Sequence, residues 1–278
     1  MKTEAAAVAE VAEQYYDSDD ADRFYFNIWG GEDIHIGLYE SPRQSVREAS
    51  RATVERMADQ LEAVKPSTHI LDIGAGYGGA ARYLARRFGC RVTCLNLSET
   101  QNRRNVELTR SAGLEERVHV VHGNFEALPF ADNTFDVVWS QDAILHSGDR
   151  ARVLGEVARV LRRSGEFLFT DPMQAEDCPS GVLQAVLSRI HLDSLGSVPF
   201  YREQLSAVGF GKFKFIDLTP QLARHYGRVH EELSARYTEM IQLVSKQYAE
   251  RMLAGLQRWV DAGNRGHLSW GILRAQLA

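Results

Sequence analysis

A glycine-rich turn, LDIGAGYGG at residues 71–79, carries the clearest chemical signal in the chain. Gly74, Gly76 and Gly79 have the spacing G-x-G-x-x-G, and the turn joins a short apolar run to a helical pattern. Glycines let the backbone turn sharply and approach a ligand without a Cβ atom in the way. The context therefore predicts a ligand site at Gly74, Ala75 and Gly76, and a tight turn that binds nothing is the alternative.

Asp72 stands two residues before the first glycine and limits which ligand fits. A dinucleotide brings a pyrophosphate, which binds where the start of a helix is bare and positive. A carboxylate at this position would repel a pyrophosphate. It suits a cation instead, such as the amino group of a methionine moiety beside its sulfonium. A buried structural acceptor is the alternative interpretation of Asp72.

Polar residues also follow the next predicted strand. An acid would end this strand in a dinucleotide site and bind the ribose, but this chain has Asn96 there. An amide can still bond to a hydroxyl group, less strongly than a carboxylate does. We expect Asn96, Leu97 and Gln101 to contribute to the ribose side of the same site.

Two further strand ends add candidate ligand contacts. Asn124 and Phe125 follow the third strand, where a polar group can bond to an adenine amino group and a ring can cover its face. Packing of Phe125 under the sheet edge is the alternative. Gln141 follows the fourth strand. Because open α/β sheets bind ligands at the carboxyl ends of their parallel strands, these side chains are predicted to share one site.

The elements that must position these residues alternate along the chain. Apolar runs predict seven strands, at 69–73, 91–97, 117–123, 135–140, 166–171, 212–218 and 267–277. Helical patterns lie between them at 77–89, 99–112, 149–165 and 201–210, and Ser98 with Gln101 predicts a capping box. This alternation predicts βαβ units. The expected fold class is α/β, with a Rossmann-like, seven-stranded, mostly parallel sheet.

Two regions stand outside the alternation. Residues 1–64 combine an Ala-rich helix at 1–16, an aromatic segment at 17–42 and a helical pattern at 43–64, and we interpret them as an N-terminal lid. Residues 65–278 form the α/β domain. Within it, apolar residues at spacings of three and four predict a helical insertion at 220–262, before the last strand.

Composition excludes several partners and compartments. Lys and Arg total 32 and Asp and Glu total 37, and a net charge of -5 argues against a nucleic-acid partner. An N-terminus without a long apolar run is not a signal peptide, and no apolar stretch is long enough to span a membrane. Three cysteines without metal-ligand spacing indicate reduced thiols and no metal. We expect a cytoplasmic protein with a small-molecule partner, either a monomer or a homodimer.

The motifs together resemble those of a known superfamily. LDIGAGYGG, CLNLSETQNRRN, GNFEALPF, SQDAILHS and LRRSGEFLFTDPM are similar, in order and spacing, to the motifs of class I S-adenosylmethionine-dependent methyltransferases. Residues 15–40 and HLSWG at 267–271 resemble the sarcosine/dimethylglycine N-methyltransferases, which make glycine betaine. The resemblance covers nearly the whole chain. It implies S-adenosylmethionine as the methyl donor, and sarcosine and dimethylglycine as acceptors.

The resemblance also implies catalytic residues. Related phosphoethanolamine N-methyltransferases pair a tyrosine near the N-terminus with a histidine after the fourth strand. Carried over, the histidine is His146, and the tyrosine is Tyr15 or Tyr16. An ammonium has no lone pair, so its proton must leave before it can attack a sulfonium, and these side chains can accept or relay that proton. A histidine that bonds to backbone at a helix start is the alternative for His146.

The expected substrate has a cationic end and a carboxylate end. A methylated ammonium has few N–H groups left to donate, so aromatic faces are its natural partner. The candidate rings are Tyr25, Trp29, Tyr39 and Tyr226, and Met173 follows the fifth strand. The carboxylate suits an arginine fork. Our candidate is Arg202, with Arg43, Arg47 and Arg224 as alternatives by region.

Other functions fit the same turn. A methyltransferase for phosphoethanolamine, a sterol or a quinone is the main alternative. A lipid acceptor, including that of a cyclopropane-forming relative, predicts a basic helix facing a membrane, and the mixed charges of 220–262 argue against one. A protein that binds S-adenosylmethionine without catalysis, or an NAD-dependent oxidoreductase, would also carry a glycine turn. Binding without turnover would indicate the first, and NADH binding the second.

Overall fold

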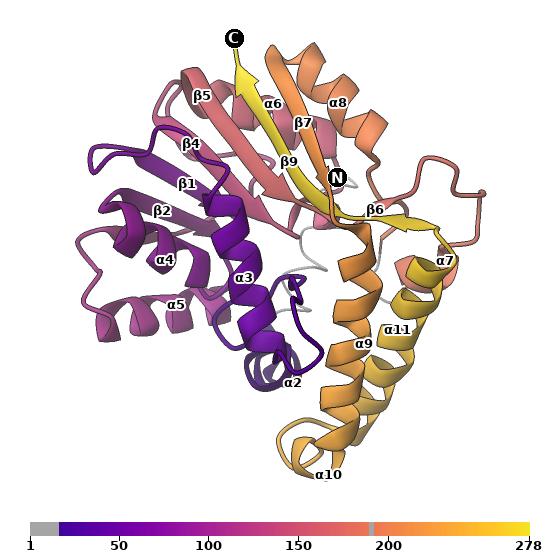
Figure 1. Ribbon diagram of the computed structural model, residues 1–278. Helices are drawn as coiled ribbons and strands as arrows, with labels where there is room; N and C mark the ends of the chain where they lie inside the picture. Colours follow the sequence, from indigo (N-terminus) through magenta and orange to yellow (C-terminus); the bar gives the residue numbers. More distant parts are fainter. Residues whose placement is uncertain (1–16, 189–191) are drawn as a thin grey trace, which may run out of the picture.

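A seven-stranded sheet forms the centre of the structure, a computed structural model that describes residues 17–188 and 192–278 (Figure 1). The strand order is β3-β2-β1-β4-β5-β9-β7. β9 runs antiparallel to β5 and β7, and the other paired strands of this sheet are parallel. The predicted mostly parallel α/β fold is therefore confirmed. The strands are β1 His69–Ile73, β2 Arg91–Asn96, β3 Val118–His122, β4 Phe135–Gln141, β5 Leu161–Thr170, β7 Phe210–Asp217 and β9 Gly271–Leu277.

Helices cover both faces of this sheet. On one face α3 and α4 pack in an apolar cluster with Ile70, and on the other face α6 and α8 pack in a cluster with Leu71 and Ile73. Both faces of β1 are buried, which explains its nearly continuous apolar sequence. These helices are α3 Val46–Ala58, α4 Gly79–Phe88, α6 Arg150–Val160 and α8 Val198–Ala207, and α5 Glu99–Ser111 packs beside β3.

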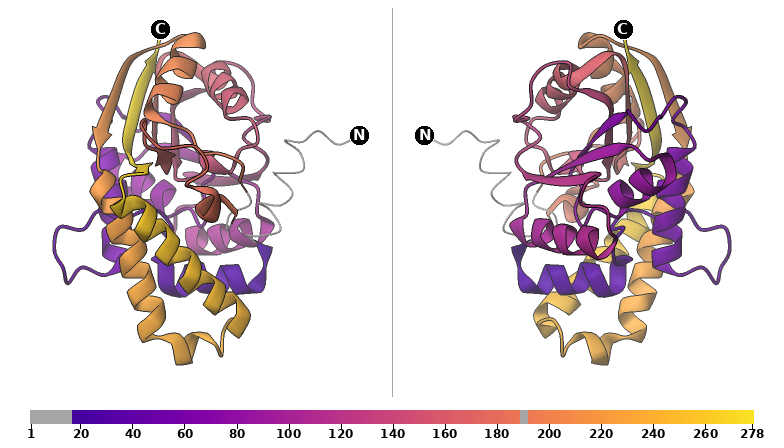
Figure 2. Two further views of the ribbon diagram at one scale, coloured as in Figure 1. Left: turned by 90° about the vertical axis from the view of Figure 1, so that its right-hand side faces the viewer. Right: turned by 90° about the vertical axis from the view of Figure 1, so that its left-hand side faces the viewer.

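A third apolar cluster joins the N-terminal segment to a long helical hairpin. The hairpin of α9 and α11 extends away from the sheet (Figure 1), and α2 lies between it and α5 (Figure 2). Asp20 on α2 bonds to Ser245 of the hairpin, and Asp22 forms an ion pair with Arg104 of α5. The elements are α2 Asp19–Phe24, the π-helix η1 Tyr25–Trp29, α7 Gln184–Leu187, α9 Thr219–Ala235, α10 Tyr237–Met240 and α11 Lys246–Asn264.

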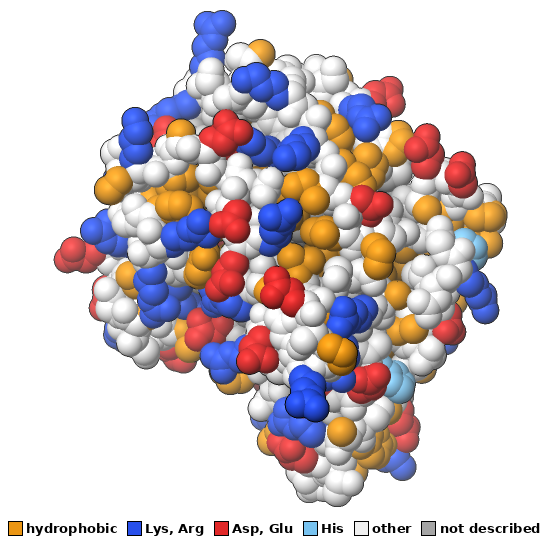
Figure 3. Space-filling model, in the orientation of Figure 1, with side chains coloured by type: hydrophobic (Ala, Val, Ile, Leu, Met, Phe, Trp, Pro, Cys, Tyr) orange, Lys and Arg blue, Asp and Glu red, His pale blue; other side chains and the backbone are white. Residues whose placement is uncertain are grey.

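Two short elements complete the described chain. A two-stranded ladder joins β6 Met173–Gln174 to β8 Leu268–Ser269, and the short 3-10 helix η2 Ile144–His146 follows β4. The face seen in Figure 3 carries acidic and basic side chains interspersed, without a broad area of one sign. In the part of the chain that the structure describes, the helices are too short or too polar to cross a bilayer.

The helix predicted at 149–165 is wrong at its C-terminal end. α6 ends at Val160, and Leu161 pairs with Phe135 as the first residue of β5. The register then shifts, and a Cβ atom at Gly165 would lie 2.8 Å from the carbonyl oxygen of Arg162. Gly165 therefore permits an irregularity within a strand, and it does not end a helix.

The remaining differences concern boundaries. The aromatic segment at 17–42, expected to be an ordered loop or a short helix with a turn, contains the short helices α2 and η1. The insertion at 220–262 forms three helices, and the last strand divides at Trp270 into β8 and β9. The helix predicted at 1–16 lies outside the described residues. The boundary between a lid and a main domain near residue 64 stays a prediction.

Candidate active site

Two adjoining pockets lie at the carboxyl ends of the parallel strands. The larger encloses about 780 Å³ of space including its mouth, and the smaller about 460 Å³. Both are lined by Ile34, Asp142 and His146, so these three residues mark the junction. The predicted residues that line the larger pocket are Gly74, Gly76, Asn96, Leu97, Gln101, Asn124, Phe125 and Gln141.

The glycine turn owes its shape to close contacts. The N–H groups of Gly74 and Ala75 both donate to the carbonyl oxygen of Leu95, which holds the turn against the end of β2. Gly74 has φ 75, and a Cβ atom there would lie 2.4 Å from the Cβ atom of Ala143. Gly74 therefore allows the residues after β4 to approach the turn and close one side of the larger pocket.

The third glycine of the motif meets a carboxylate of the protein itself. A Cβ atom at Gly79, the first residue of α4, would lie 2.2 Å from Oδ1 of Asp33. Asp33 is 2% exposed, and its Oδ2 lies 2.7 Å from the guanidinium of Arg51. The carboxylate of Asp33 at the start of α4 interacts favourably with the helix dipole. It also occupies the space that a pyrophosphate would need and would repel its negative charge. This arrangement argues against a dinucleotide ligand.

Asp72 and Asp33 form a pair of buried carboxyl groups beside the turn. Within the described part of the chain, Oδ2 of Asp72 and Oδ1 of Asp33 have no hydrogen-bond partner. Burial, with a smaller contribution from Asp33, raises the pKa of Asp72 to about 8. Burial also raises the pKa of Asp33 to about 6, against the opposing effect of Arg51. A nearby cation would stabilise both ionised forms.

Asp72 and Ala75 nevertheless do not line the larger pocket. Asp72 is 3% exposed, and Ala75 packs in the apolar cluster under α3 and α4. Asp72 lies behind the glycine turn, so its charge would reach a ligand through the turn rather than from the pocket wall.

The amide side chains after β2 hold one another in place. Oδ1 of Asn96 accepts from Gly76 N at 3.3 Å, and its Nδ2 donates to Oε1 of Gln101 at 3.1 Å. Ser98 Oγ accepts from Gln101 N, which forms one half of the predicted capping box. The side chain of Gln101 bonds to Asn96 instead of to the backbone of Ser98, so the reciprocal half does not form.

Asn124 and Gln141 are also held by internal hydrogen bonds. Oδ1 of Asn124 accepts from Glu126 N at 2.8 Å, which leaves the Nδ2 group for a ring nitrogen of a base. Oε1 of Gln141 accepts from the indole of Trp139 at 3.0 Å. The buried Nε2 of Gln141 has no partner among the residues described. It offers a neutral donor to an acidic or carbonyl group of a ligand.

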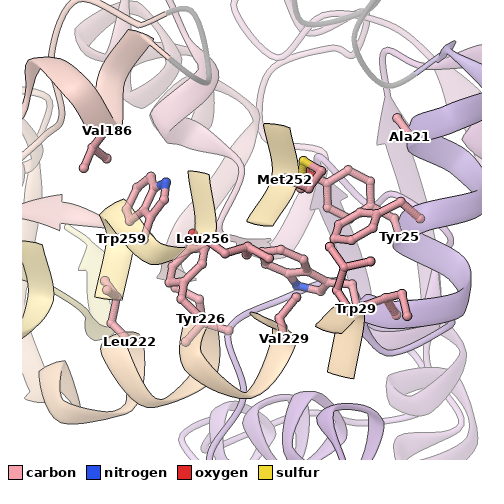
Figure 4. Packing of buried hydrophobic residues seen from close by; sticks show 14 of the residues in the cluster. Ala21, Tyr25, Trp29, Val186, Leu222, Tyr226, Val229, Met252, Leu256 and Trp259 are labelled. Carbon is pink, nitrogen blue, oxygen red and sulfur yellow. The ribbon is translucent and has the colours of Figure 1, made fainter. Parts of the chain in front are cut away.

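Aromatic rings form much of the smaller pocket (Figure 4). Tyr25 and Trp29 come from η1, Tyr226 from α9 and Trp259 from α11. Tyr226 and Trp259 stack with centroids 4.7 Å apart, and Trp29 meets Tyr226 edge to face at 5.6 Å. Ring faces of this kind attract a cation, and more strongly in a pocket shielded from water.

Asp142 is the site residue that sequence reasoning missed. Its Oδ2 accepts from Ile36 N at 2.7 Å, and its Oδ1 accepts from the indole of Trp270 at 2.8 Å. These two bonds fix the carboxylate at the junction of the pockets. Asp142 also has φ 50, an uncommon backbone conformation for a residue with a side chain, which often marks a functional position. An acid directly after a strand, inside SQDAILH, is a signal that could have identified it.

The N-terminal segment contributes two further unpredicted residues. Ile34 lines both pockets, and His35 lines the larger one. Burial lowers the pKa of His35 to about 3, so this imidazole is neutral near pH 7. Glu126, which follows Phe125, also lines the larger pocket.

The predicted catalytic residues divide into two groups. His146 lies at the junction of the two pockets. Tyr15 and Tyr16 lie outside the described residues. The adjoining Asp17 accepts hydrogen bonds from Ser98 Oγ and Thr100 N, and Ser98 lines the larger pocket.

Three predicted substrate residues lie away from both pockets. Tyr39 is buried, with its hydroxyl 3.0 Å from Nδ1 of His225. Met173 is buried in the core on the α6 and α8 side of the sheet. Arg202 is exposed on α8, with its guanidinium over the ring of Phe213. Among residues 17–188 and 192–278, the pocket linings contain no Lys or Arg.

Comparison with known proteins identifies the family. Residues 71–169 match the model of a methyltransferase domain. The chain is 54% identical over 263 residues to a sarcosine/dimethylglycine N-methyltransferase of Halorhodospira halochloris, with 95% of this chain and 94% of that one covered. A glycine/sarcosine/dimethylglycine N-methyltransferase of Actinopolyspora halophila is also 54% identical, over 265 residues and 95% of this chain, but the match spans only 47% of that longer relative. A solved structure attributed to a sarcosine dimethylglycine methyltransferase of Galdieria sulphuraria has a TM-score of 0.89 at 41% identity, with 94% of this chain and 98% of that one covered.

The fold and the larger pocket define an enzyme of the S-adenosylmethionine-dependent methyltransferase class. The amide donor of Gln141, which lines the larger pocket and has no partner in the described chain, fits a ligand that carries a carboxylate, as S-adenosylmethionine does. Within that class, the chain belongs to the family of sarcosine/dimethylglycine N-methyltransferases. Family membership removes the NAD-dependent oxidoreductase from the alternatives.

Proposed function

We propose that this enzyme methylates the nitrogen of sarcosine and then of dimethylglycine, and so makes glycine betaine and S-adenosylhomocysteine. The observation that carries the proposal is the smaller pocket, where aromatic rings and one fixed carboxylate adjoin the larger pocket at Asp142 and His146. The names of the relatives support the same acceptors. The three free cysteines support a cytoplasmic location.

The larger pocket is proposed to hold the methyl donor. S-adenosylmethionine supplies a methyl group that its sulfonium already activates. We assign its amino group to the turn at Gly74 and Gly76, backed by Asp72, and its adenosine to the amides after β2 and β3. The cofactor residues proposed from the sequence are therefore retained, with Asp72 and Ala75 acting from behind the turn.

The smaller pocket is proposed to hold the amine. The rings of Tyr25, Trp29 and Tyr226 lie around a methylated ammonium, each good contact contributing about 0.5–2 kcal/mol. Asp142 supplies the opposite charge at the junction, where the nitrogen must meet the methyl group. This arrangement stabilises the positive charge that grows on nitrogen during transfer, which is the charge that differs between ground and transition states.

The chemical step needs an amine with a free lone pair. The nitrogen forms a bond to the methyl carbon while the carbon–sulfur bond breaks, and its electron pair stays on sulfur. Before this step the substrate ammonium must lose a proton, and we propose that His146 accepts this proton. The partnership of His146 with Tyr15 or Tyr16 is kept as part of the proposal.

The substrate carboxylate is proposed to bind neutral donors. The buried indole N–H groups of Trp29 and Trp259 have no partner within the described residues, and both rings line the smaller pocket. A buried donor without a partner costs about 1–3 kcal/mol, a penalty that a carboxylate oxygen would relieve. Arg202 is not proposed to bind the substrate carboxylate, because α8 places it on the outer surface, away from the smaller pocket.

Turnover assays test the whole proposal. Purified protein is incubated with S-adenosylmethionine and, separately, with glycine, sarcosine, dimethylglycine and phosphoethanolamine, and mass spectrometry follows the methylated amine and S-adenosylhomocysteine. We expect betaine from both sarcosine and dimethylglycine. Turnover of phosphoethanolamine alone, or of no acceptor, would refute the proposed substrates and leave the methyltransferase fold in place.

A further inference from the structure

A buried carboxyl group connects η2, the short helix that carries His146, to α8, a helix that lines neither pocket. Asp171 follows β5 and is fully buried. Its Oδ1 accepts from Leu145 N at 2.9 Å, and its Oδ2 accepts from the hydroxyl of Tyr201 on α8 at 2.6 Å. Leu145 directly precedes His146 in η2. Asp171 thus joins α8 to the turn that carries His146.

The backbone around His146 is held on its other sides as well. The carbonyl oxygen of Leu145 accepts from Arg150 at 2.9 Å, and Arg150 also donates to the carbonyl oxygen of Ser194. The N–H of His146 donates to the carbonyl oxygen of Ala143 at 3.1 Å. The peptide group between Leu145 and His146 is therefore fixed at both ends, and Asp171 fixes the peptide group before it.

Tyr201 has little freedom to move. Its ring meets Phe169 edge to face at 5.1 Å, and a Cβ atom at Gly196 would lie 2.7 Å from the ring. A phenylalanine would fill the same space, so packing alone does not require the hydroxyl. In the part of the chain that the structure describes, that hydroxyl forms a hydrogen bond to Asp171 alone.

The charges around Asp171 come from three elements. Burial raises its pKa to about 7, and Tyr201 on α8 and Arg150 on α6 oppose this change. Asp142 after β4 adds a smaller contribution that raises the pKa further. Loss of the Tyr201 hydroxyl would remove the strongest of the opposing influences and favour the protonated acid.

We infer that Tyr201 and Asp171 form a positioning pair that holds His146 at the junction of the two pockets. Neither residue lines a pocket, so the pair acts through the η2 backbone and not by contact with substrate. The inference rests on the proposed role of His146 in methyl transfer.

Replacement of Tyr201 by Phe tests the pair. Because a shift of about 1 Å in a reacting group can cost roughly 100-fold in rate, we expect Tyr201→Phe to lower kcat about 10–100-fold. The KM for dimethylglycine and the Kd for S-adenosylhomocysteine should stay within roughly threefold, since Tyr201 contacts neither pocket. The matched control is Thr93→Val, which removes the hydrogen bond between Thr93 in β2 and His69 at the other end of β1.

A spectroscopic signal separates positioning from simple destabilisation. In protein with isotope-labelled histidines, the ring resonances of His146, assigned with His146→Asn, should shift in Tyr201→Phe and stay in place in Thr93→Val. An unchanged kcat with unmoved His146 resonances would overturn the inference. A shift of these resonances in an enzyme that turns over neither sarcosine nor dimethylglycine would uphold the positioning pair and refute the proposed function.

A second variant covers the case in which Tyr201→Phe does not fold. Arg150 is only partly buried, and Arg150→Met keeps its aliphatic stem while removing the bond to the carbonyl oxygen of Leu145. We expect the same selective loss of kcat and the same displacement of the His146 resonances. A rise in KM with kcat intact would show that this region shapes the substrate site directly, which would contradict the inference.

Discussion

Replacement of Asp142 by Asn tests the charge at the centre of the proposed substrate site. The change keeps the size of the side chain and removes its charge. Asp142 accepts from Ile36 N on one oxygen and from the indole of Trp270 on the other. An amide offers one acceptor oxygen, so one of these donors would face an NH2 group. We expect the free energy of unfolding to fall by about 1.5–3 kcal/mol, the range for a hydrogen bond to a charged group.

The catalytic loss should be larger than the loss of one hydrogen bond explains. A carboxylate about 4–5 Å from a cationic nitrogen contributes about 3–4 kcal/mol at an effective dielectric constant near 20. Removal of the charge should therefore lower kcat/KM for dimethylglycine by about 100–1,000-fold. Mass-spectrometric initial rates measure the change, and calorimetric titration with S-adenosylhomocysteine checks that the larger pocket is intact.

The control for this variant is Trp270→Phe. It removes one hydrogen bond to Asp142 but keeps the carboxylate, so it reports the effect of loosening alone. We expect Trp270→Phe to lose stability to a similar extent and kcat/KM by about tenfold at most. If both variants lose activity equally, or if Asp142→Asn keeps kcat/KM within roughly threefold of the wild type, the assigned charge role is wrong.

Three further variants test other parts of the site. Burial raises the pKa of Asp72 to about 8 from its ordinary value of 3.8, so the folded protein retains a proton that the unfolded chain releases, and stability falls as pH rises from about 4 to 8. Asp72→Asn should remove this fall, visible as a flatter dependence of Tm on pH, while weakening S-adenosylhomocysteine binding about tenfold. Trp259→Phe keeps the ring and loses a buried N–H group, so the KM for dimethylglycine should rise about tenfold, and an unchanged KM would exclude this donor from carboxylate binding. Gly74→Ala places a Cβ atom at a positive φ and against the residues after β4, which should cost about 1–3 kcal/mol and abolish tight cofactor binding in calorimetry. Gly155→Ala, in a helix with open space around it, is the control and should not destabilise the protein.

The sequence predicted the parts of the site that depend on neighbouring residues in the chain, namely the glycine turn and the side chains at strand ends. The glycine turn lies between β1 and α4, and the amides Asn96, Asn124 and Gln141 each lie at or just after the end of a parallel strand. Their common edge follows from the topology alone, because parallel strands end on the same side of a sheet. The position of these residues at the larger pocket could therefore be predicted without any knowledge of the helices above it.

The parts that depend on distant contacts were not predictable in the same way. Arg202 and Tyr39 have suitable chemistry, but α8 turns the first outward and His225 engages the second. The helical pattern of α6 continues past Val160, and only pairing of Leu161 with Phe135 converts it to strand. The carboxylate of Asp142 is held in place by two hydrogen-bond donors, Ile36 and Trp270, each more than 100 residues away in the sequence.

The π-helix at Tyr25–Trp29 makes the arrangement of the aromatic rings depend on the number of residues in the N-terminal segment. A π-helical turn holds one residue more than an α-helical turn, so it is equivalent to a single-residue insertion. Conversion of Tyr25–Trp29 to α-helical hydrogen bonding without a deletion would rotate the side chains that follow by roughly 100°. Trp29 would then leave the smaller pocket although every aromatic residue was still present. A relative that is one residue shorter here can keep the elements on both sides in place as an α-helix, but it has one position fewer from which to present a ring to the smaller pocket.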